Sequence, residues 1–270
     1  KNLENSNVLI LTNEKMDSII RHGAEWIEDI GLVISDEVHL IGDESRGPTL
    51  EMILTHLKLL DTKPQIIGLS ATITNSNEIA DWLECKLVKN DWRPVPLSEG
   101  VCDGGHVTMS DGKTFEVKPS LRGIPIDLGV QSVQQGGQSL VFAETRVRSK
   151  SLATKASDVV SQLLGKKELA VLEKTSKQIL AENEHTEIVK TLATLVRKGV
   201  AFHHAGLNQK CREIVEKEFR KGTIKLLSST PTLAAGVNLP ARRVVISNIN
   251  RYNAKVGANK PISILEYKQL

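Results

Sequence analysis

The sequence predicts an α/β fold made of two lobes, each built around a parallel sheet. Short apolar runs that are typical of buried strands alternate with longer segments whose apolar residues recur at helical spacing. This alternation is typical of parallel strands joined by crossover helices. The same pattern occurs on both sides of a proline-rich segment, so we predict two similar lobes within the 270 residues.

The first lobe is assigned residues 1–90. Its expected strands are Val8–Leu11, Leu32–Ser35 and Gln65–Leu69, and its expected helices follow Thr12 through Arg21, run from Pro48 through Leu57, and run from Glu78 to Leu83. Pro48 suits the first turn of a helix, because the N–H group that proline lacks would have no intrahelical partner there.

Residues 91–128 are predicted to form a linker with a small antiparallel excursion. Four prolines interrupt this segment: Pro94, Pro96, Pro119 and Pro125. Asp111-Gly112 is a strong hairpin turn, and the strands that it joins are expected at Val107–Met109 and Thr114–Val117.

The second lobe is assigned residues 129–270. Its expected strands are Ser139–Ala143, Val200–Phe202, Ile224–Ser228 and Arg243–Ser247, and its expected helices are Ser149–Leu164 and Cys211–Arg220. Gly222 suits the position just past a helix end. The charged stretch Lys166–Lys198 is predicted to be helical and to face solvent.

A β-hairpin with a basic, partly aromatic tip is predicted near the end of the chain. Val244–Asn250 and Ile262–Tyr267 are β-prone, and the segment between them carries the tip residues Arg251, Tyr252, Lys255 and Lys260. An aromatic side chain at such a tip can stack on an exposed base pair, which would offset part of the lost base stacking.

Composition and charge limit the protein class. The chain is 40% hydrophobic and 25% charged, with a net charge of +3, which permits an acidic partner without requiring one. No apolar run approaches the ~18 residues of a membrane span. The three cysteines are odd in number and far apart, so we expect neither a disulfide framework nor a metal site, and a reducing intracellular setting.

Two adjacent carboxylates follow the second predicted strand. Mg²⁺ prefers hard oxygen ligands and keeps several waters, so Asp36 and substrate phosphates could hold it. Glu37 could orient or deprotonate a water. Ser70 and Thr72 end the next strand, where their hydroxyls can bond to His39. For the acidic pair alone, a structural role beside a helix start is the more common alternative.

Polar residues also follow the strands of the second lobe. His203 and His204 end one strand without a third ligand at metal-binding spacing, so a hydrogen bond to phosphate or carbonyl groups is favoured over a metal. Thr230 could contact phosphate at a helix start. Gly236 and Asn238 allow close backbone approach, although an ordinary capped helix would also explain this segment.

Jointly these motifs resemble a known family. Asp-Glu-Val-His at 36–39, Ser-Ala-Thr at 70–72, Val-Phe-Ala-Glu-Thr-Arg at 141–146, Phe-His-His-Ala-Gly-Leu at 202–207 and Thr-Pro-Thr-Leu-Ala-Ala-Gly-Val-Asn-Leu-Pro at 230–240 occur in the order seen in superfamily two DExH-box helicases. The residues of these motifs are most similar to those of the Ski-type branch. Within this branch they resemble the archaeal DNA helicases of stalled replication forks, which are related to the polymerase theta helicase domain.

The resemblance implies two RecA-like domains with ATP bound between them. Asp36 would then hold Mg²⁺ through water, and Glu37 would be the catalytic base. His39, Ser70 and Thr72 would couple the nucleotide state to domain closure. Gly236 and Asn238 would face the nucleotide.

The resemblance also implies a path for a nucleic-acid strand. The residues expected to hold its backbone are Thr12, Lys15, Arg46, Thr145, Arg146, His204 and Thr230. Hydroxyls, guanidinium groups and helix N-termini position a strand without reading its bases. The predicted hairpin would pry the duplex apart, so deleting residues 252–260 is expected to remove unwinding while leaving DNA-stimulated ATP hydrolysis largely intact.

Two motifs expected from the resemblance are missing from the 270 residues. No Gly-x-x-x-x-Gly-Lys-Ser/Thr loop is present, and the arginine-bearing motif expected after Gln269 is absent. We therefore expect a fragment, with an N-terminally incomplete first domain and a second domain that stops before the arginine finger. Alone it is expected to be inactive as an ATPase.

The parent protein is predicted to be an ATP-dependent DNA helicase and nucleoside-triphosphate hydrolase. It would move 3′ to 5′ on single-stranded DNA as a monomer and unwind duplex or forked DNA in repair or replication, with no membrane partner. A Ski-type RNA helicase and an inactive nucleic-acid-binding scaffold remain as alternatives, since backbone contacts tolerate either sugar.

Overall fold

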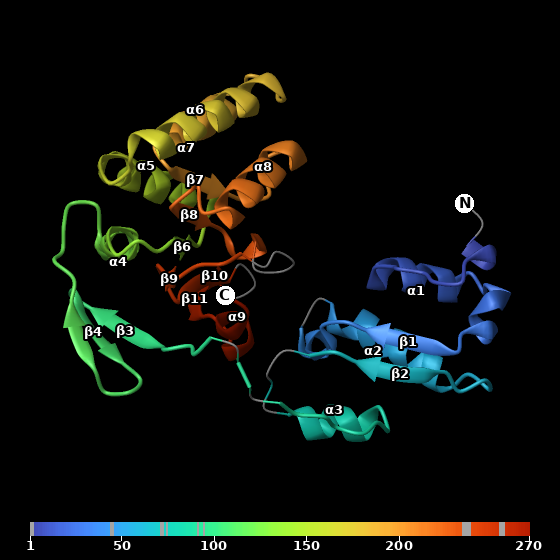
Figure 1. Cartoon of the computed structure of the whole chain (residues 1–270). Helices are drawn as coiled ribbons and strands as arrows, with labels where there is room; N and C mark the ends of the chain where they lie inside the picture. The colour runs from blue at the N-terminus through green and yellow to red at the C-terminus, as the bar shows by residue number, and fades with distance from the viewer. Residues whose placement is uncertain are drawn as a thin grey trace. The chain divides into compact units, whose positions relative to one another are not determined.

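The computed structural model describes the chain apart from residues 1–2, 44–45, 71–72, 74, 91, 94, 234–238 and 254–256, and apart from the side chains of residues 232, 252, 253, 265 and 269. The chain separates into two compact units, Lys1–Pro94 and Val95–Leu270, each described below by itself (Figure 1). The finer division at residues 90 and 128 stays a proposal.

Unit 1 contains a two-stranded parallel sheet with helices around it. β1 (Leu32–Ser35) pairs with β2 (Gln65–Gly68), with Leu32 opposite Gln65. The helices are α1 (Asn13–Arg21), α2 (Gly47–Lys58) and α3 (Ser76–Trp82), with 3-10 turns at Leu3–Asn5, Glu25–Asp29 and Val38–Gly42. These helices and both strands confirm the predicted positions within a few residues.

Helix α2 carries the core of unit 1. Its residues Leu50, Leu54 and Leu57 are at most 2% exposed. Leu50 and Leu54 pack in one apolar cluster with Val38, whereas Leu57 packs in a second cluster with Ile19. Because both clusters depend on α2, this helix holds the ends of β1 and β2 in place.

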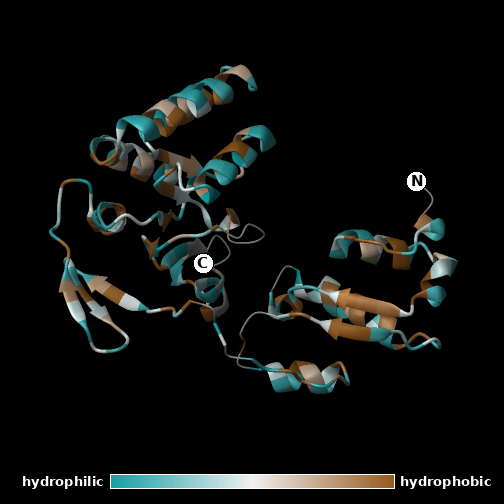
Figure 2. Cartoon of the chain, in the orientation of Figure 1, coloured by the Kyte–Doolittle hydropathy of each residue, from teal (hydrophilic) through white to brown (hydrophobic). Residues whose placement is uncertain are grey.

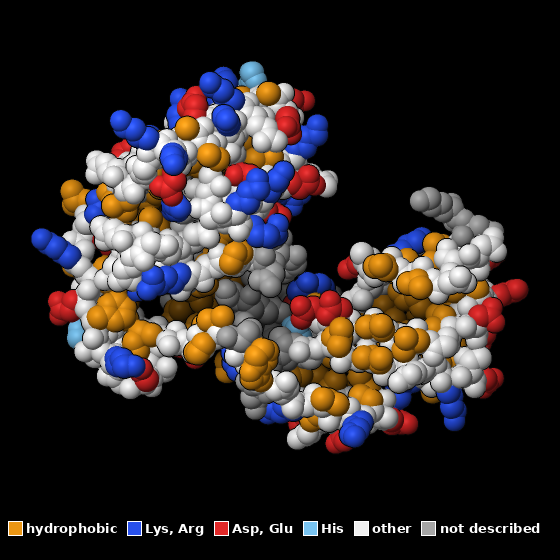
Figure 3. Space-filling model, in the orientation of Figure 1, with side chains coloured by type: hydrophobic (Ala, Val, Ile, Leu, Met, Phe, Trp, Pro, Cys, Tyr) orange, Lys and Arg blue, Asp and Glu red, His pale blue; other side chains and the backbone are white. Residues whose placement is uncertain are grey.

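The strand predicted at Val8–Leu11 is wrong. These residues pair with no strand, and Val8 and Ile10 are 80% and 95% exposed. A strand needs a hydrogen-bonding neighbour, and among the described residues β1 and β2 pair only with each other. Figure 3 shows hydrophobic side chains on the surface of unit 1, and Figure 2 shows that β1 and β2 consist largely of hydrophobic residues. In β1, Leu32 and Ile34 are 51% and 59% exposed.

Unit 2 contains a four-stranded parallel sheet in the order β7-β8-β6-β9. The strands are β6 (Ser139–Phe142), β7 (Val200–His203), β8 (Leu226–Ser229) and β9 (Arg243–Ile246), all close to their predicted positions. α4 (Ile124–Gln134) packs on β6 and β9, and α5 (Arg146–Gln162) packs on β7 and β8. α8 (Gln209–Arg220) packs on β7 and ends before Gly222, whose φ of +79° suits a glycine just past a helix.

The charged stretch of unit 2 is helical as predicted but does not simply face solvent. It forms two helices, α6 (Lys166–Ala181) and α7 (Glu187–Arg197), which pack on each other (Figure 1). Leu172, Ile179 and Leu192 are fully buried in the main core of the unit. The prediction failed because the high charge of the exposed faces masked an apolar stripe at helical spacing.

Two antiparallel elements complete unit 2. β3 (Gly100–Asp103), β4 (His106–Met109) and β5 (Thr114–Glu116) form a small sheet, in which the predicted Asp111-Gly112 turn joins the last two strands. β10 (Asn250–Asn253) and β11 (Ala258–Pro261) form a hairpin.

The predicted hairpin exists, but its strands were placed wrongly. They lie where the tip was expected, because Val244–Ile246 belongs to the parallel strand β9. Residues Ile264–Gln269 form helix α9 rather than a strand, since the Ser263 side chain caps the helix start by accepting the Glu266 N–H at 3.0 Å.

Candidate nucleotide and nucleic-acid sites

The first candidate site lies at the carboxyl end of β1. Asp36 and Glu37 follow the strand directly, and both are exposed. Glu37 adopts a left-handed backbone, with φ 53° and ψ 43°. This conformation costs a non-glycine residue about 1–2 kcal/mol, and such costs are typical of functional sites. The Glu37 N–H donates to Asp36 Oδ1 at 2.9 Å, which holds the two residues in this turn.

The carboxylate of Glu37 lies beside a buried imidazole. Glu37 Oε2 is 3.3 Å from His39 Nδ1, and Ser70 Oγ is 3.4 Å from the same nitrogen. His39 is only 3% exposed, so packing fixes its ring. Nδ1 either donates to the carboxylate or accepts the Ser70 hydroxyl, depending on the tautomer. The structure therefore joins three of the predicted site residues through one nitrogen.

Backbone hydrogen bonds bring the two strand ends together. The Leu69 N–H donates to Ser35 O at 2.8 Å, and the Val38 N–H donates to Leu69 O at 2.8 Å. These bonds continue the β1–β2 pairing past the last strand residues, so Ser70 is held next to His39. Thr72, the third predicted coupling residue, lies outside the described residues.

The residues around Asp36 fit a hydrated divalent cation. The Asp36 carboxylate is exposed, and one of its oxygens is oriented by the Glu37 N–H. Within the described ranges, no group of three or more His, Cys, Asp or Glu side chains could hold a metal ion. A single carboxylate suits Mg²⁺, which keeps waters and takes substrate phosphate oxygens as ligands, and would not suit a metal that needs a full protein cage.

The start of α2 is shaped by a close backbone contact. The Gly47 N–H donates to Asp43 O at 2.8 Å, and a Cβ atom built on Gly47 would lie 2.2 Å from Ile41 O. Only glycine fits there. Asp43 also accepts the Arg46 N–H at 2.8 Å and lies 3.7 Å from the Arg46 guanidinium. Arg46 is thus placed at the helix start, as predicted, with a carboxylate beside it.

Thr12 and Lys15 lie at the start of α1. Thr12 caps the helix by accepting the Lys15 N–H at 3.3 Å, and both side chains are exposed. The pKa of Glu14 is lowered by a hydrogen bond from its own backbone N–H, by the Thr12 side chain and by the charge of Arg46. The three strand-binding residues predicted in unit 1 are thus grouped at two neighbouring helix starts.

The second candidate site lies at the carboxyl edge of the unit 2 sheet. Thr145 follows β6, His204 follows β7 and Thr230 follows β8, and these strands are neighbours. Thr145 caps α5 by accepting the Arg148 N–H at 3.1 Å, and the Thr230 backbone N–H donates to His203 O at 3.2 Å. Because parallel strands end at the same edge, the predicted residues of this unit are brought together.

The environment of His204 fixes its protonation. Its Nδ1 accepts the Gly206 N–H at 3.1 Å, so the ring proton is on Nε2. The ring stacks on Phe202 at 5.3 Å and is 3% exposed. Burial first, and then the charges of Arg146 and His203, lower the pKa of His204. The ring is therefore neutral near pH 7 and presents an N–H donor, which suits a phosphate oxygen.

A partly buried pair that the sequence did not reveal involves His203, the residue before His204. His203 Nε2 is 2.8 Å from Glu216 Oε1 of α8. Burial lowers the pKa of His203 although the Glu216 carboxylate opposes this. The only feature of the sequence that indicates this pair is the position of Glu216 next to the apolar residues Ile214 and Val215, on the helix that packs on β7. The pair ties the end of β7 to α8.

The hairpin residues are only partly described. Arg251 and Lys260 are cross-strand partners in β10 and β11, and Arg251 forms an ion pair with Glu266 at 3.2 Å. The side chain of Tyr252 and all of Lys255 lie outside the described residues, as do Gly236 and Asn238.

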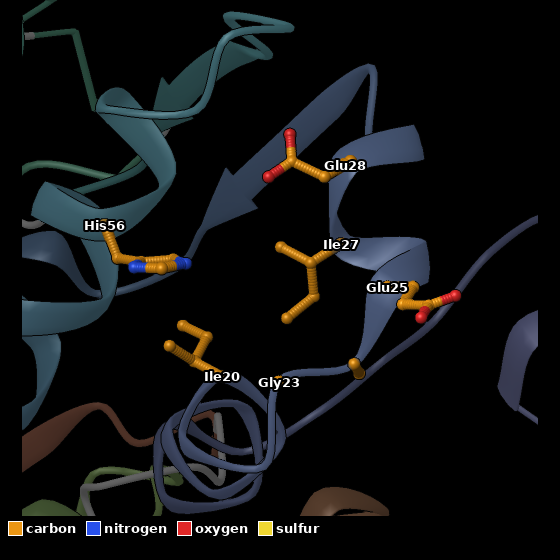
Figure 4. A pocket seen from close by; sticks show the side chains of 7 residues that line it. Ile20, Gly23, Glu25, Ile27, Glu28 and His56 are labelled. Atoms are coloured by element: carbon orange, nitrogen blue, oxygen red, sulfur yellow. The ribbon is translucent and has the colours of Figure 1, made fainter.

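A shallow hollow of about 370 Å³ lies elsewhere on unit 1 (Figure 4). It is lined by residues of α1, the following 3-10 turn and α2, among them Ile20, Glu28 and His56. None of the predicted site residues lines it, so it does not belong to the sites described above.

Across the described residues, no helix is both long and apolar enough to cross a lipid bilayer.

Two helicase family models match this chain. The family model of the DEAD/DEAH box helicases matches residues 1–79, and that of the helicase conserved C-terminal domain matches residues 124–257. A Pyrobaculum calidifontis protein named ATP-dependent DNA helicase Hel308 is 43% identical over 274 residues, covering 100% of this chain and 38% of its own length.

Proteins of the same name from two other organisms are similar. That of Methanocella arvoryzae is 42% identical over 268 residues, covering 99% of this chain and 36% of its own length. That of Caldivirga maquilingensis is 44% identical over 274 residues, covering 97% of this chain and 35% of its own length. The chain thus spans little more than a third of these relatives.

Proposed function

This chain belongs to the DEAD/DEAH box helicases of superfamily two, and from that premise we propose that it is part of the motor of an ATP-dependent DNA helicase. The observation that carries the proposal is the carboxyl end of β1, where an exposed carboxylate pair meets the buried His39 ring and the end of β2. These contacts support a hydrolysis site at Asp36 and Glu37 with a coupling element next to it in the same unit.

The proposed chemistry is hydrolysis of the terminal phosphoanhydride bond of ATP. Asp36 would hold Mg²⁺ through water, and the ion would neutralise charge that develops on the phosphate oxygens. Glu37 would orient the attacking water and accept its proton. Its left-handed backbone aims the carboxylate away from the strand axis toward His39. The hydrogen bonding of the His39 ring would then depend on whether the Glu37 carboxylate contacts the attacking water or the ring itself.

The proposed nucleic acid is single-stranded DNA, bound through its phosphates. Thr12, Lys15 and Arg46 would hold it in unit 1, and Thr145, Arg146, His204 and Thr230 in unit 2. All of these described residues lie at helix starts or strand ends, where N–H groups and cations favour phosphate. The relatives are named DNA helicases, which favours DNA over RNA. By family resemblance the motor would move 3′ to 5′ as a monomer and act on forked DNA.

The hairpin formed by β10 and β11 is proposed to separate the strands of the duplex. Its strand β11 (Ala258–Pro261) is exposed, and the hairpin carries Lys260 and Tyr252. Removal of residues 252–260 from the complete gene product is expected to abolish unwinding.

The proposed setting is the reducing interior of the cell. Cys85, Cys102 and Cys211 are all free thiols, and Cys211 is buried.

The test uses the complete gene product. ATP hydrolysis is measured with no nucleic acid, with single-stranded DNA and with single-stranded RNA, and unwinding is measured on a forked DNA duplex. Stimulation by DNA together with unwinding is expected. Stimulation by RNA alone would replace the proposal with an RNA helicase, and binding of nucleic acid without hydrolysis would replace it with a scaffold.

A further inference from the structure

An ion pair joins the hairpin to the helix that follows it. Arg251 lies in β10 and Glu266 lies in α9, and Arg251 Nε donates to Glu266 Oε1 at 3.2 Å. Arg251 Nη1 also donates to Asn248 O at 3.3 Å. The two side chains are 22% and 34% exposed. The Arg251 side chain therefore has partners within unit 2 on two sides and is largely shielded from solvent.

The pairing register explains why Arg251 needs a nearby carboxylate. In the hairpin Arg251 is directly opposite Lys260. Two like charges at directly opposite positions destabilise a strand pair. Glu266 supplies the compensating negative charge, which draws the Arg251 side chain toward α9.

Helix α9 is a suitable anchor because it is held at other points. The Ile262 N–H donates to Ile249 O at 2.7 Å and closes the base of the hairpin just before the helix. Tyr267 of α9 lies near Glu99, and burial together with the charge of Glu99 raises the pKa of the Tyr267 hydroxyl. The backbone of Glu99 is in turn fixed, since its carbonyl accepts the Ser110 N–H at 2.8 Å. Thus α9 connects the hairpin to the small antiparallel sheet of unit 2.

We infer that the Arg251–Glu266 pair sets the direction in which the hairpin leaves unit 2, so that Arg251 is a positioning residue and not a contact to nucleic acid. The inference rests on the proposed strand-separating role of the hairpin. A two-stranded hairpin is only marginally stable by itself. Without the pair the hairpin would sample several directions, and steps of the motor along one strand would be less well converted into opened base pairs.

The test is a charge exchange in the complete gene product. R251E, E266R and the double variant R251E/E266R are compared by the number of base pairs opened on a forked duplex per ATP hydrolysed. Each single variant is expected to lower this ratio about tenfold, and the double variant to recover most of it, because residues in direct contact show strong coupling. A Lys113→Glu variant, which changes an exposed pair on the β4–β5 hairpin, is the matched control and is expected to leave the ratio unchanged.

A direct contact between Arg251 and phosphate gives the opposite result. The double variant would then be as defective as R251E, and E266R alone would have no effect; either outcome overturns the inference. If charge reversal lowers the thermal midpoint, R251Q, E266Q and their combination replace it. R251Q and E266Q are expected to lower the ratio equally, and their combination is expected to lower it no further. A double variant whose defect is the product of the two single defects overturns the inference.

Deletion of residues 252–260 tests the strand-separating role of the hairpin independently of the positioning role of the Arg251–Glu266 pair. If the deletion variant still unwinds normally, the strand-separating role of the hairpin is wrong. If the deletion abolishes unwinding but the charge variants of Arg251 and Glu266 do not lower the ratio, only the positioning role is wrong.

Discussion

The buried ring of His39 lies against the carboxylate of Glu37, with 3.3 Å between Nδ1 and Oε2. Ser70 at the end of β2 reaches the same nitrogen at 3.4 Å. The His39 ring thus connects Glu37, the expected catalytic base, to Ser70 at the end of the neighbouring strand. We expect a structural change at Glu37 or at Ser70 to affect the other residue through this ring. The predictions below use the complete gene product wherever activity is measured.

Replacement of Glu37 by Gln is expected to lower DNA-stimulated ATP hydrolysis by about 10²–10⁴-fold, which is the usual contribution of a general base. ATP binding is expected to persist, because the amide keeps the shape of the side chain. Steady-state hydrolysis and nucleotide binding are measured together. Glu84→Gln is the control, since Glu84 shares the left-handed backbone (φ 53°) and an ion pair, with Lys58. Equal activity of E37Q and E84Q would contradict the assignment.

Replacement of Ser70 by Ala removes the hydroxyl that meets His39 Nδ1. We expect unwinding to fall more than ATP hydrolysis, by roughly tenfold against twofold, because one hydrogen bond to a buried group is worth about 1–1.5 kcal/mol. Both rates are measured on the same forked substrate. A proportional loss of the two rates would mean that Ser70 serves hydrolysis itself.

Replacement of Arg146 by Ala is expected to weaken binding of single-stranded DNA equally for all sequences. The slope of log affinity against log salt should fall by about 0.7, the value for one phosphate contact to a single strand. Titrations at several salt concentrations give this slope. Lys155→Ala, on the exposed surface of the same helix, is the matched control. An unchanged slope for R146A would remove Arg146 from the strand path.

Acid is expected to destabilise unit 2 through its two strand-end histidines. Burial lowers the pKa of both His203 and His204 below the ordinary value of 6.5, so the unfolded chain binds protons more readily than the folded unit. The stability that they contribute is fully present above pH 6.5 and is lost as the pH falls below it. The slope is at most about 1.4 kcal/mol per pH unit for each histidine.

Calorimetry between pH 5 and pH 8 measures this dependence. His204→Asn is expected to flatten the decline below pH 6.5, whereas His106→Asn, at an exposed position on β4, is expected to preserve it. A decline that His204→Asn leaves as steep as before would assign it to other groups.

Replacement of Leu192 by Ala in α7 tests whether the charged stretch belongs to the core. Leu192 is fully buried, so the free energy of unfolding should fall by about 2–5 kcal/mol. Lys190→Ala, two residues earlier on the exposed side, should change it by less than about 0.5 kcal/mol. Thermal and urea unfolding of both variants give the comparison. Similar small effects would mean that the helix pair is a solvated appendage.

Local signals predicted most of the fold. The strands of the unit 2 sheet are short apolar runs between residues that disfavour strands. Thr12 marks the start of α1, because threonine is a preferred N-cap residue. The meeting of His39 and Ser70 could also be predicted, since sequential parallel strands usually lie side by side.

The errors share one physical cause, which is that the partner of a segment decides its structure. Val8–Leu11 has the composition of a strand but pairs with none of the described strands. Lys166–Lys198 looked solvated because its charges are more conspicuous than the apolar positions that face the core. The Arg251–Glu266 and His203–Glu216 pairs join residues 15 and 13 positions apart and depend on how a strand and a helix pack, which no local pattern encodes.

The tight fit at Gly47 has a consequence for mapping the strand path by mutagenesis. Any side chain there would overlap the carbonyl of Ile41 in the turn that carries His39. A substitution would displace that turn and impair hydrolysis without touching DNA or nucleotide. Loss of activity at position 47 would therefore result from steric overlap between two backbone segments. A map drawn from loss-of-function positions alone would overstate the DNA-contact surface proposed around Arg46.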